Sequence, residues 1–233
     1  MAPVEGYYYK MNNRTLIRDL RSKIGSPVRL AGWAEKIRDQ KRMQFLVVRD
    51  HTGVVQTANE KTGKPLDYTI SSLNPESAVV AEGKVVSNDA VRLGGLEIQL
   101  DVLDVQGPAE KNLPVTAESN IDARLDWRYL DLRDPKKLLV FKVQTTAEQA
   151  MREWWANNGF IEIHSPKLVG GASESGAELF KLDYFGQSAS LAQSPQFYKQ
   201  MAMAAGFDRV FEIGPVFRAN PSFTSRHDTE FTS

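Results

Sequence analysis

Near the end of the sequence stands the stretch Val216-Phe217-Arg218-Ala219-Asn220-Pro221-Ser222-Phe223-Thr224-Ser225-Arg226-His227-Asp228-Thr229-Glu230-Phe231. The hydrophobic run over residues 209–217 predicts a strand that carries Arg218 at its tip. Asn-Pro and Ser/Thr residues, typical of turns, come next. Arg226 and His227 then lead into an alternating, returning strand. The stretch therefore predicts a β-hairpin with cations at its mouth, which suits a bound anion such as a triphosphate.

The composition is typical of a soluble globular protein. Of the 233 residues, 42% are hydrophobic and 25% are charged. Because 29 basic residues balance 29 acidic ones, any nucleic-acid contact must use a local basic patch. The absence of cysteine excludes disulfides and thiolate metal sites. We see no signal peptide and no apolar run of membrane length, so we expect a cytoplasmic protein without a membrane partner.

The first part of the chain has the period-two alternation of β-strands. Turn signals separate the runs, and a short helix is predicted over residues 74–77, before the fourth run. Five short strands with a small helix in this place indicate an all-β OB-fold barrel. We assign this domain to residues 1–107. The predicted strands cover residues 28–33, 44–49, 54–56, 78–86 and 96–105.

After the barrel the pattern changes. Residues 108–135 contain a dense arginine/aspartate run between prolines and are predicted to be a hinge. Residues 136–233 show helical spacing followed by short strands, which predicts an α+β segment dominated by antiparallel strands. Because its last strand would stop at Ser233 with one edge unpartnered, we expect a fragment of a larger catalytic domain.

Candidate chemistry in the barrel centres on Phe45. An aromatic ring on a strand can stack on a nucleic-acid base while arginine and glutamine read the base edge. The alternative is that Phe45 belongs to the core and that the charges form a solvated face. Alternation places Phe45 opposite Gln44 and Leu46 but does not say which face is wet. Nearby polar residues are Arg38, Gln40, Lys41, Arg42, Gln44 and Gln56.

In the second part, phosphate binding would depend on side chains, because there is no Walker loop and no GxGxxG. Arg218 would hold an α-phosphate, with Arg226 and His227 at the outer phosphates. Either Phe223 or Phe231 would lie against an adenine ring. The alternative is that the two arginines form weak surface ion pairs with Glu230 and Asp228.

Two further positions suit an amino-acid substrate. Gln196 and Lys199 are three apart on one predicted helical face, where an amide and an ammonium would bind a small carboxylate. Glu174, in a loop of small residues, would bind an amino group. The alternatives are a solvent-facing helix start and a mobile surface loop. We find no residues at metal-ligand spacing.

Taken together, these segments resemble the class II aminoacyl-tRNA synthetases, specifically the aspartyl enzymes of archaeal and eukaryotic type. Residues 28–56 are similar to the family's anticodon-binding OB domain. The helix that leads to His164-Ser165-Pro166 is similar to its motif 1, and Phe217-Arg218-Ala219 through Glu230-Phe231 to its motif 2. Leu191-Ala192-Gln193-Ser194-Pro195-Gln196-Phe197-Tyr198-Lys199-Gln200 favours aspartate, because a lysine would lose its ion pair with neutral asparagine.

The resemblance implies ATP-dependent ligation of L-aspartate to tRNA through an aspartyl-adenylate, that is, an aspartate–tRNA ligase. Whether tRNA-Asp alone or also tRNA-Asn is charged stays open. Pro166 would lie at a homodimer interface formed by the motif 1 region. The implied ATP-binding residues are Arg218, which is also catalytic, with Asn220, Phe223, Arg226 and His227. Glu174, Gln196 and Lys199 would bind aspartate, and Arg38, Gln40, Phe45, Gln56 and Glu97 the anticodon.

Three departures from the family pattern matter. Asn220 stands where an acidic residue usually contacts adenine, and Ser175 replaces a glycine after Glu174. The Mg²⁺ ligands and the motif 3 arginine are expected downstream of Ser233. These 233 residues by themselves are therefore expected not to catalyse aminoacylation.

Two alternative functions stay open. One is an RNA- or tRNA-binding OB module joined to an inactive synthetase-like segment. The other is a synthetase for asparagine or lysine.

Overall fold

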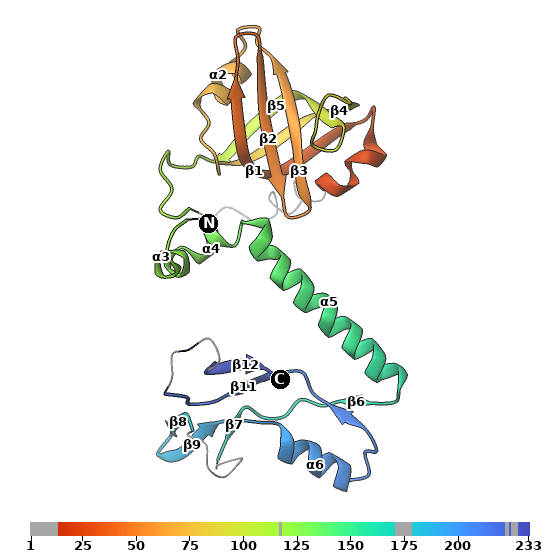
Figure 1. Ribbon diagram of the computed structural model, residues 1–233, viewed down its shortest axis with the longest axis vertical. Coiled ribbons are helices and arrows are strands. Elements are labelled where there is room, and N and C mark those ends of the chain that lie inside the picture. Colours follow the sequence, from red (N-terminus) through yellow and green to blue (C-terminus); the bar gives the residue numbers. More distant parts are fainter. Residues whose placement is uncertain (1–13, 117, 171–178, 222–223, 225–227) are drawn as a thin grey trace. The chain divides into compact units, whose positions relative to one another are not determined.

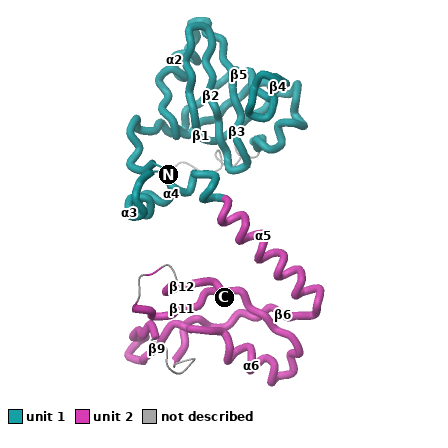
Figure 2. The backbone as a smooth tube through the Cα atoms, in the orientation of Figure 1, with its two compact units in different colours: residues 1–138 teal, residues 139–233 magenta. Residues whose placement is uncertain are grey.

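The computed structural model describes residues 14–116, 118–170, 179–221, 224 and 228–233. The chain divides into two compact units, residues 1–138 and 139–233 (Figure 2). Within the described residues, no helix has the length and apolar character that crossing a membrane requires. The finer division at residues 107 and 135 stays a prediction.

The first unit is built on a closed barrel (Figure 1). Its strand order is β1-β2-β3-β5-β4, with β4 pairing back onto β1. All pairs are antiparallel except β3 with β5, where Gln56 lies opposite Glu97. This architecture confirms the predicted OB-fold. The strands are β1 (Pro27–Asp39), β2 (Met43–Asp50), β3 (Gly53–Glu60), β4 (Ala78–Ser87) and β5 (Leu96–Gly107).

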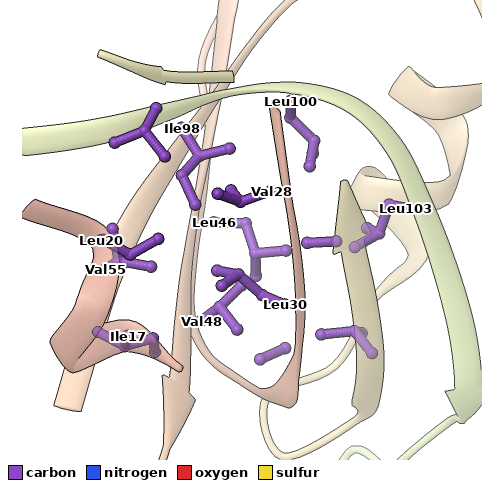
Figure 3. Packing of buried hydrophobic residues seen from close by; sticks show 14 of the residues in the cluster. Ile17, Leu20, Val28, Leu30, Leu46, Val48, Val55, Ile98, Leu100 and Leu103 are labelled. Carbon is purple, nitrogen blue, oxygen red and sulfur yellow. The ribbon is translucent and has the colours of Figure 1, made fainter. Parts of the chain in front are cut away.

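Apolar side chains from alternating strand positions fill the barrel. The labelled Leu30, Leu46 and Val48 point into its interior (Figure 3), and each is at most 1% exposed. The 3-10 helix η1 (Ile17–Lys23) adds Ile17 and Leu20 to the same cluster. The period-two pattern therefore produces a single core for this unit.

The short helix of the barrel is α2 (Pro65–Ser72), so the prediction of a helix over residues 74–77 was wrong. Its start is set by Asp67, whose carboxylate accepts hydrogen bonds from the backbone amides of residues 62–64. Buried Gln44 donates to the Asp67 carbonyl, and Asn59 donates to both Gln44 and the Asp67 carboxylate. The hydrogen bond from Asn59 is the largest cause of the lowered pKa of Asp67. This buried polar cluster attaches α2 to the barrel.

The predicted hinge residues pack as part of the first unit. They form α3 (Ile121–Asp126) and α4 (Arg128–Asp131). Arg133 contacts Glu76 at 3.1 Å and lies over the Trp33 ring at 4.9 Å, which attaches this segment to the barrel. Asp131 accepts hydrogen bonds from Lys137 and Arg124, both at 2.9 Å, and pairs with Arg128. Led by the hydrogen bond from Lys137, these cations lower the pKa of Asp131 to about 2.

The second unit combines short strands with helices, which confirms the predicted α+β class. Strand β9 pairs antiparallel with both β7 and β8, and β11 pairs antiparallel with β12. Strands β6 and β10 are parallel. The elements are α5 (Pro135–Asn157), which begins in the first unit, β6 (Ile161–Glu162), β7 (Leu168–Val169), β8 (Lys181–Tyr184), β9 (Gln187–Leu191), α6 (Gln196–Ala204), β10 (Val210–Phe211), β11 (Pro215–Phe217) and β12 (Glu230–Thr232).

The predicted continuous strand over residues 209–217 is interrupted. Residues 212–214 separate β10 from β11, so the first half pairs with β6 and the second half with β12. Phe211 packs on Trp155 with ring centroids 4.4 Å apart, which holds β10 against α5. Because of this interruption, one continuous hydrophobic segment forms two strands that pair with different partners.

Candidate functional site

An open cavity of about 670 Å³ lies on the outer face of the barrel. Phe45 lines it, while its neighbours Gln44 and Leu46 point inward and are 0% and 1% exposed. Phe45 is half-buried and does not belong to the core cluster. Core packing therefore does not explain the position of the Phe45 ring. The face of β2 that carries Phe45 is the one that faces solvent.

Polar side chains from three strands form a row beside the ring. Arg38 donates from Nη2 to Gln56 Oε1 at 2.6 Å, and Gln56 donates from Nε2 to Glu97 Oε2 at 3.3 Å. The Arg38 guanidinium carbon lies 5.0 Å from the centroid of the Phe45 ring. The parallel pairing of β3 with β5 brings Gln56 beside Glu97. An aromatic platform next to donors and acceptors suits a nucleic-acid base, which stacks by its face and is read at its edge.

The structure brings together four of the five predicted barrel residues and leaves one apart. Gln40 lies beyond the end of β1 in the exposed turn to β2, where its backbone amide donates to the Met43 carbonyl. It does not line the cavity. Its predicted role in anticodon reading stays untested, but it would have to act from outside this cavity.

Sequence reasoning missed one wall of the cavity. The loop between β4 and β5 contributes Asn88 and residues 90–93, and β1 adds Glu35 and Lys36. Of the loop residues, Arg92 is exposed and carries a positive charge. The positive charge of Arg92 in a loop was the one sequence signal for this wall. Only barrel closure, however, brings this loop to the cavity that Phe45 lines.

Arg218 follows the end of β11 in the second unit. Its backbone amide donates to the Thr229 carbonyl at 2.9 Å, and its guanidinium carbon lies 5.2 Å from the centroid of the Phe231 ring. Within the part of the chain that is described, Arg218 makes no ion pair with Glu230 or Asp228, the proposed alternative. Phe231 stacks on this arginine and orients it.

The hairpin is closed by a polar contact as well. Asn220 donates from Nδ2 to the Asp228 carbonyl at 3.3 Å, and its amide donates to the Arg218 carbonyl at 2.8 Å. Asn220 thus joins the two arms of the hairpin close to Arg218. Four predicted site residues lie outside the described residues, namely Glu174, Phe223, Arg226 and His227.

The predicted carboxylate-binding pair lies at the start of α6. Gln196 is exposed and Lys199 half-buried, and the helix begins with the Lys199 amide donating to the Pro195 carbonyl. The Phe217 amide donates to the Ala192 carbonyl at 3.0 Å. The strand that ends before Arg218 is thereby bonded to the segment that leads into α6.

A buried carboxylate was also missed from the sequence. Glu212 follows β10 and accepts hydrogen bonds from Ser165 and Lys167, two residues that follow β6. Burial raises the pKa of Glu212, but the hydrogen bonds from Lys167 and Ser165 outweigh burial and hold the pKa below its usual value. The partners are distant in sequence, and only the parallel β6–β10 pair brings them together.

Metal binding has no support within the described ranges. They include no group of histidine, cysteine, aspartate or glutamate side chains that could hold a metal ion. The described residues therefore do not fit a magnesium site.

Comparison with known proteins identifies a domain type for each part of the chain. A model for "tRNA synthetases class II (D, K and N)" matches residues 120–233. A model for an "OB-fold nucleic acid binding domain" from anticodon-binding proteins matches residues 28–106. The chain therefore carries a class II tRNA synthetase domain that follows an OB-fold.

Individual relatives are similar to this chain over most of its length. An aspartate–tRNA(Asp/Asn) ligase of Aeropyrum pernix is 41% identical over 94% of this chain and 50% of its own length. An aspartate–tRNA(Asp) ligase of Pyrococcus horikoshii is 42% identical over 88% and 48%. The crystal structure of asparaginyl-tRNA synthetase from Pyrococcus horikoshii with asparaginyl-adenylate matches with a TM-score of 0.87 at 35% identity, over 94% of this chain and 51% of that one. The chain spans about half the length of the relatives it matches.

Proposed function

We propose that this chain serves an ATP-dependent aspartate–tRNA ligase, with the barrel holding the tRNA anticodon and the second unit contributing to formation of aspartyl-adenylate. One observation carries the catalytic part of the proposal. The Phe217–Ala192 hydrogen bond joins the strand leading to Arg218 to the segment leading to Gln196 and Lys199. Arg218, which would bind phosphate, and the Gln196–Lys199 pair, which would bind a carboxylate, therefore follow segments that are hydrogen-bonded to each other.

The proposed reaction has two steps. In the first, an α-carboxylate oxygen of aspartate attacks the α-phosphorus of ATP, and the bond to pyrophosphate breaks. Arg218 neutralises the charge that develops on the α-phosphate oxygens. In the second step, a hydroxyl of the terminal tRNA ribose attacks the adenylate carbonyl, and AMP leaves.

Amino-acid choice is assigned to α6. The Lys199 ammonium binds the side-chain carboxylate of aspartate, and Gln196 donates its amide to the same group. Asparagine has the same shape but no charge, so it would leave the lysine unpaired. The curated relatives named for aspartate support this choice.

The barrel cavity supplies the tRNA contact in this proposal. Phe45 stacks on an anticodon base, while Arg38, Gln56 and Glu97 read base edges. Relatives are named for tRNA(Asp/Asn) and for tRNA(Asp), and we assign the choice between these tRNAs to base contacts in the same cavity.

We also propose that the enzyme is a homodimer formed through the motif 1 region. Apolar side chains along α5 are exposed, including Val140 at 63% and Trp154 at 59%. Pro166 is exposed as well. An unpartnered apolar surface of this kind favours association. Light scattering on the chain and on Trp154→Glu tests this, with a dimer expected for the first and a monomer for the second.

A second candidate is an RNA-binding module without ligase activity. It is favoured by the barrel cavity, which is complete within the first unit. The test is pyrophosphate exchange into ATP by the full gene product that carries this chain. Exchange that depends on aspartate, and not on asparagine or lysine, is expected. Tight tRNA binding without exchange for any amino acid would overturn the ligase and leave the binding module.

A further inference from the structure

The pair formed by Lys167 and Glu212 is not used by the chemistry above. Lys167 Nζ lies 2.5 Å from Glu212 Oε1, and the Glu212 side chain is 2% exposed. Ser165 donates to the same carboxylate from its backbone amide at 3.2 Å and from Oγ at 3.0 Å. Three hydrogen bonds therefore converge on one buried carboxylate, and Lys167 Nζ also donates to Ser165 Oγ at 3.0 Å.

Stability alone is a weak reason for such a pair. Removing two charges from water is costly, and apolar residues of similar volume are often as stable in the same place. A buried carboxylate with three hydrogen bonds does, however, fix the relative position of the segments that supply it and its donors. Here those segments are residues 165–167, which follow β6, and residue 212, which follows β10.

Backbone hydrogen bonds extend this contact into a closed ring. The Lys167 carbonyl accepts from the Ala192 amide at 2.9 Å, and the Ala192 carbonyl accepts from the Phe217 amide at 3.0 Å. Phe217 and Glu212 belong to one short run of chain, residues 212–217. The ring therefore runs from Glu212 through Lys167, Ala192 and Phe217, and back along the chain to Glu212.

The phosphate-binding and carboxylate-binding parts of the proposed site both follow segments of this ring in the sequence. Arg218 directly follows Phe217, and residues 193–195 lead from Ala192 into α6 with Gln196 and Lys199. We propose that Lys167 and Glu212 are positioning residues for adenylate formation, which set the spacing between Arg218 and the pair on α6. This inference rests on the proposed ligase function.

Gly214 offers a probe that keeps both charges. A Cβ added there would lie 3.2 Å from Glu212 Oε1 and 3.6 Å from Lys167 Nζ. The first distance is tight, so Gly214→Ala would displace the carboxylate without removing it. A control pair exists in the same unit, because Glu162 accepts from Arg152 Nε at 3.1 Å while both side chains stay partly exposed.

The experiment measures aspartate-dependent exchange by the full gene product, with kcat and the KM values for ATP and aspartate determined separately. Melting curves show which variants are folded at the assay temperature. Lys167→Met and Glu212→Gln are expected to lower kcat about 100-fold, as a small displacement of reacting groups does. Lys167→Arg should recover most of the activity. Glu162→Gln should stay within about twofold of the parent, since exposed pairs contribute little.

Three results would overturn the proposal. The first is folded variants that melt at lower temperature but keep the parent's kcat and KM, which would make the pair purely stabilising. The second is Lys167→Arg being as inactive as Lys167→Met. If the charge-removing variants do not fold, Gly214→Ala becomes the deciding variant. The third overturning result is a folded Gly214→Ala with the kcat and KM values of the parent. If the unsubstituted gene product shows no exchange, the proposed ligase function is wrong, and the positioning role that rests on it is wrong as well.

Discussion

Arg38 on β1 and Gln56 on β3 are joined by a hydrogen bond of 2.6 Å across the outer face of the barrel. Gln56 is 7% exposed, so it provides a fixed acceptor for an arginine whose own side chain is at the surface. The bond holds the guanidinium over the Phe45 ring. A base entering the cavity would therefore meet donors that are already oriented, which reduces the entropy cost of binding.

Replacing Phe45 by alanine should weaken binding of a tRNA-Asp anticodon stem-loop by about 1–3 kcal/mol, the usual range for one stacked base. Thermal stability should change little, because Phe45 lies outside the core cluster. Fluorescence anisotropy titrations measure the affinity. Tyr68→Ala is the matched control, since Tyr68 is 70% exposed and does not line the cavity. Equal affinities for the two variants would exclude stacking on Phe45.

Arg38→Met should reduce discrimination between the cognate anticodon and a changed one by about 1–3 kcal/mol, as expected for a base-edge contact. The slope of binding against salt should stay nearly constant. A phosphate contact would behave in the opposite way, lowering the slope by about one and leaving discrimination intact. Arg42→Met, at an exposed turn position outside the cavity, serves as the comparison.

Lys199→Met should raise the KM for aspartate about 100-fold while the KM for ATP stays close to that of the parent. The reason is that the side-chain carboxylate would lose its charged partner in a partly desolvated site. Pyrophosphate exchange at varied aspartate measures this. Lys181→Met removes an equally charged but exposed side chain on β8 and should leave both constants unchanged. Parallel rises in both KM values would argue against a specific contact with aspartate.

Asp131 gives a pH dependence with a definite sign. Its folded pKa of about 2 lies below the ordinary value of 3.8, so the folded state favours the charged form. Its stabilisation is complete above the ordinary value and is lost as the pH falls towards 2. Asp131→Asn should therefore lower the urea midpoint at neutral pH, and the difference should shrink as the pH falls through about 2 and vanish below it. Asp126→Asn, an exposed carboxylate on α3, should show no such convergence.

Gly83→Ala should destabilise the barrel by about 1–3 kcal/mol or more, as overpacking does. An added Cβ would lie 2.1 Å from the Gln99 carbonyl oxygen, which is backbone and cannot move aside without shifting β5. At Gly107 the nearest atom would be 3.7 Å away, an ordinary contact. Urea unfolding of Gly83→Ala and Gly107→Ala should therefore separate the two. Similar midpoints would contradict the close approach of β4 and β5.

Strand β2 shows which features of the barrel can be predicted from the sequence and which cannot. The spacing of Gln44, Phe45 and Leu46 predicts two faces but leaves open which one is buried. Hydrophobicity alone would put Phe45 inside and Gln44 outside, and the structure has the reverse. Gln44 is tolerated inside because Asn59 and α2 satisfy its amide. That compensation depends on a helix whose position the sequence did not reveal.

The sequence by itself determined the period-two strands of an OB barrel, the α+β character of the second part and the motif residues that resemble those of class II synthetases. Each of these rests on local spacing, which short-range backbone geometry controls. Tertiary structure alone decided which face of β2 meets solvent, which loop completes the cavity and which lysine pairs with Glu212. Those features join residues far apart in the chain, and their partners are set by barrel closure and by the β6–β10 pairing.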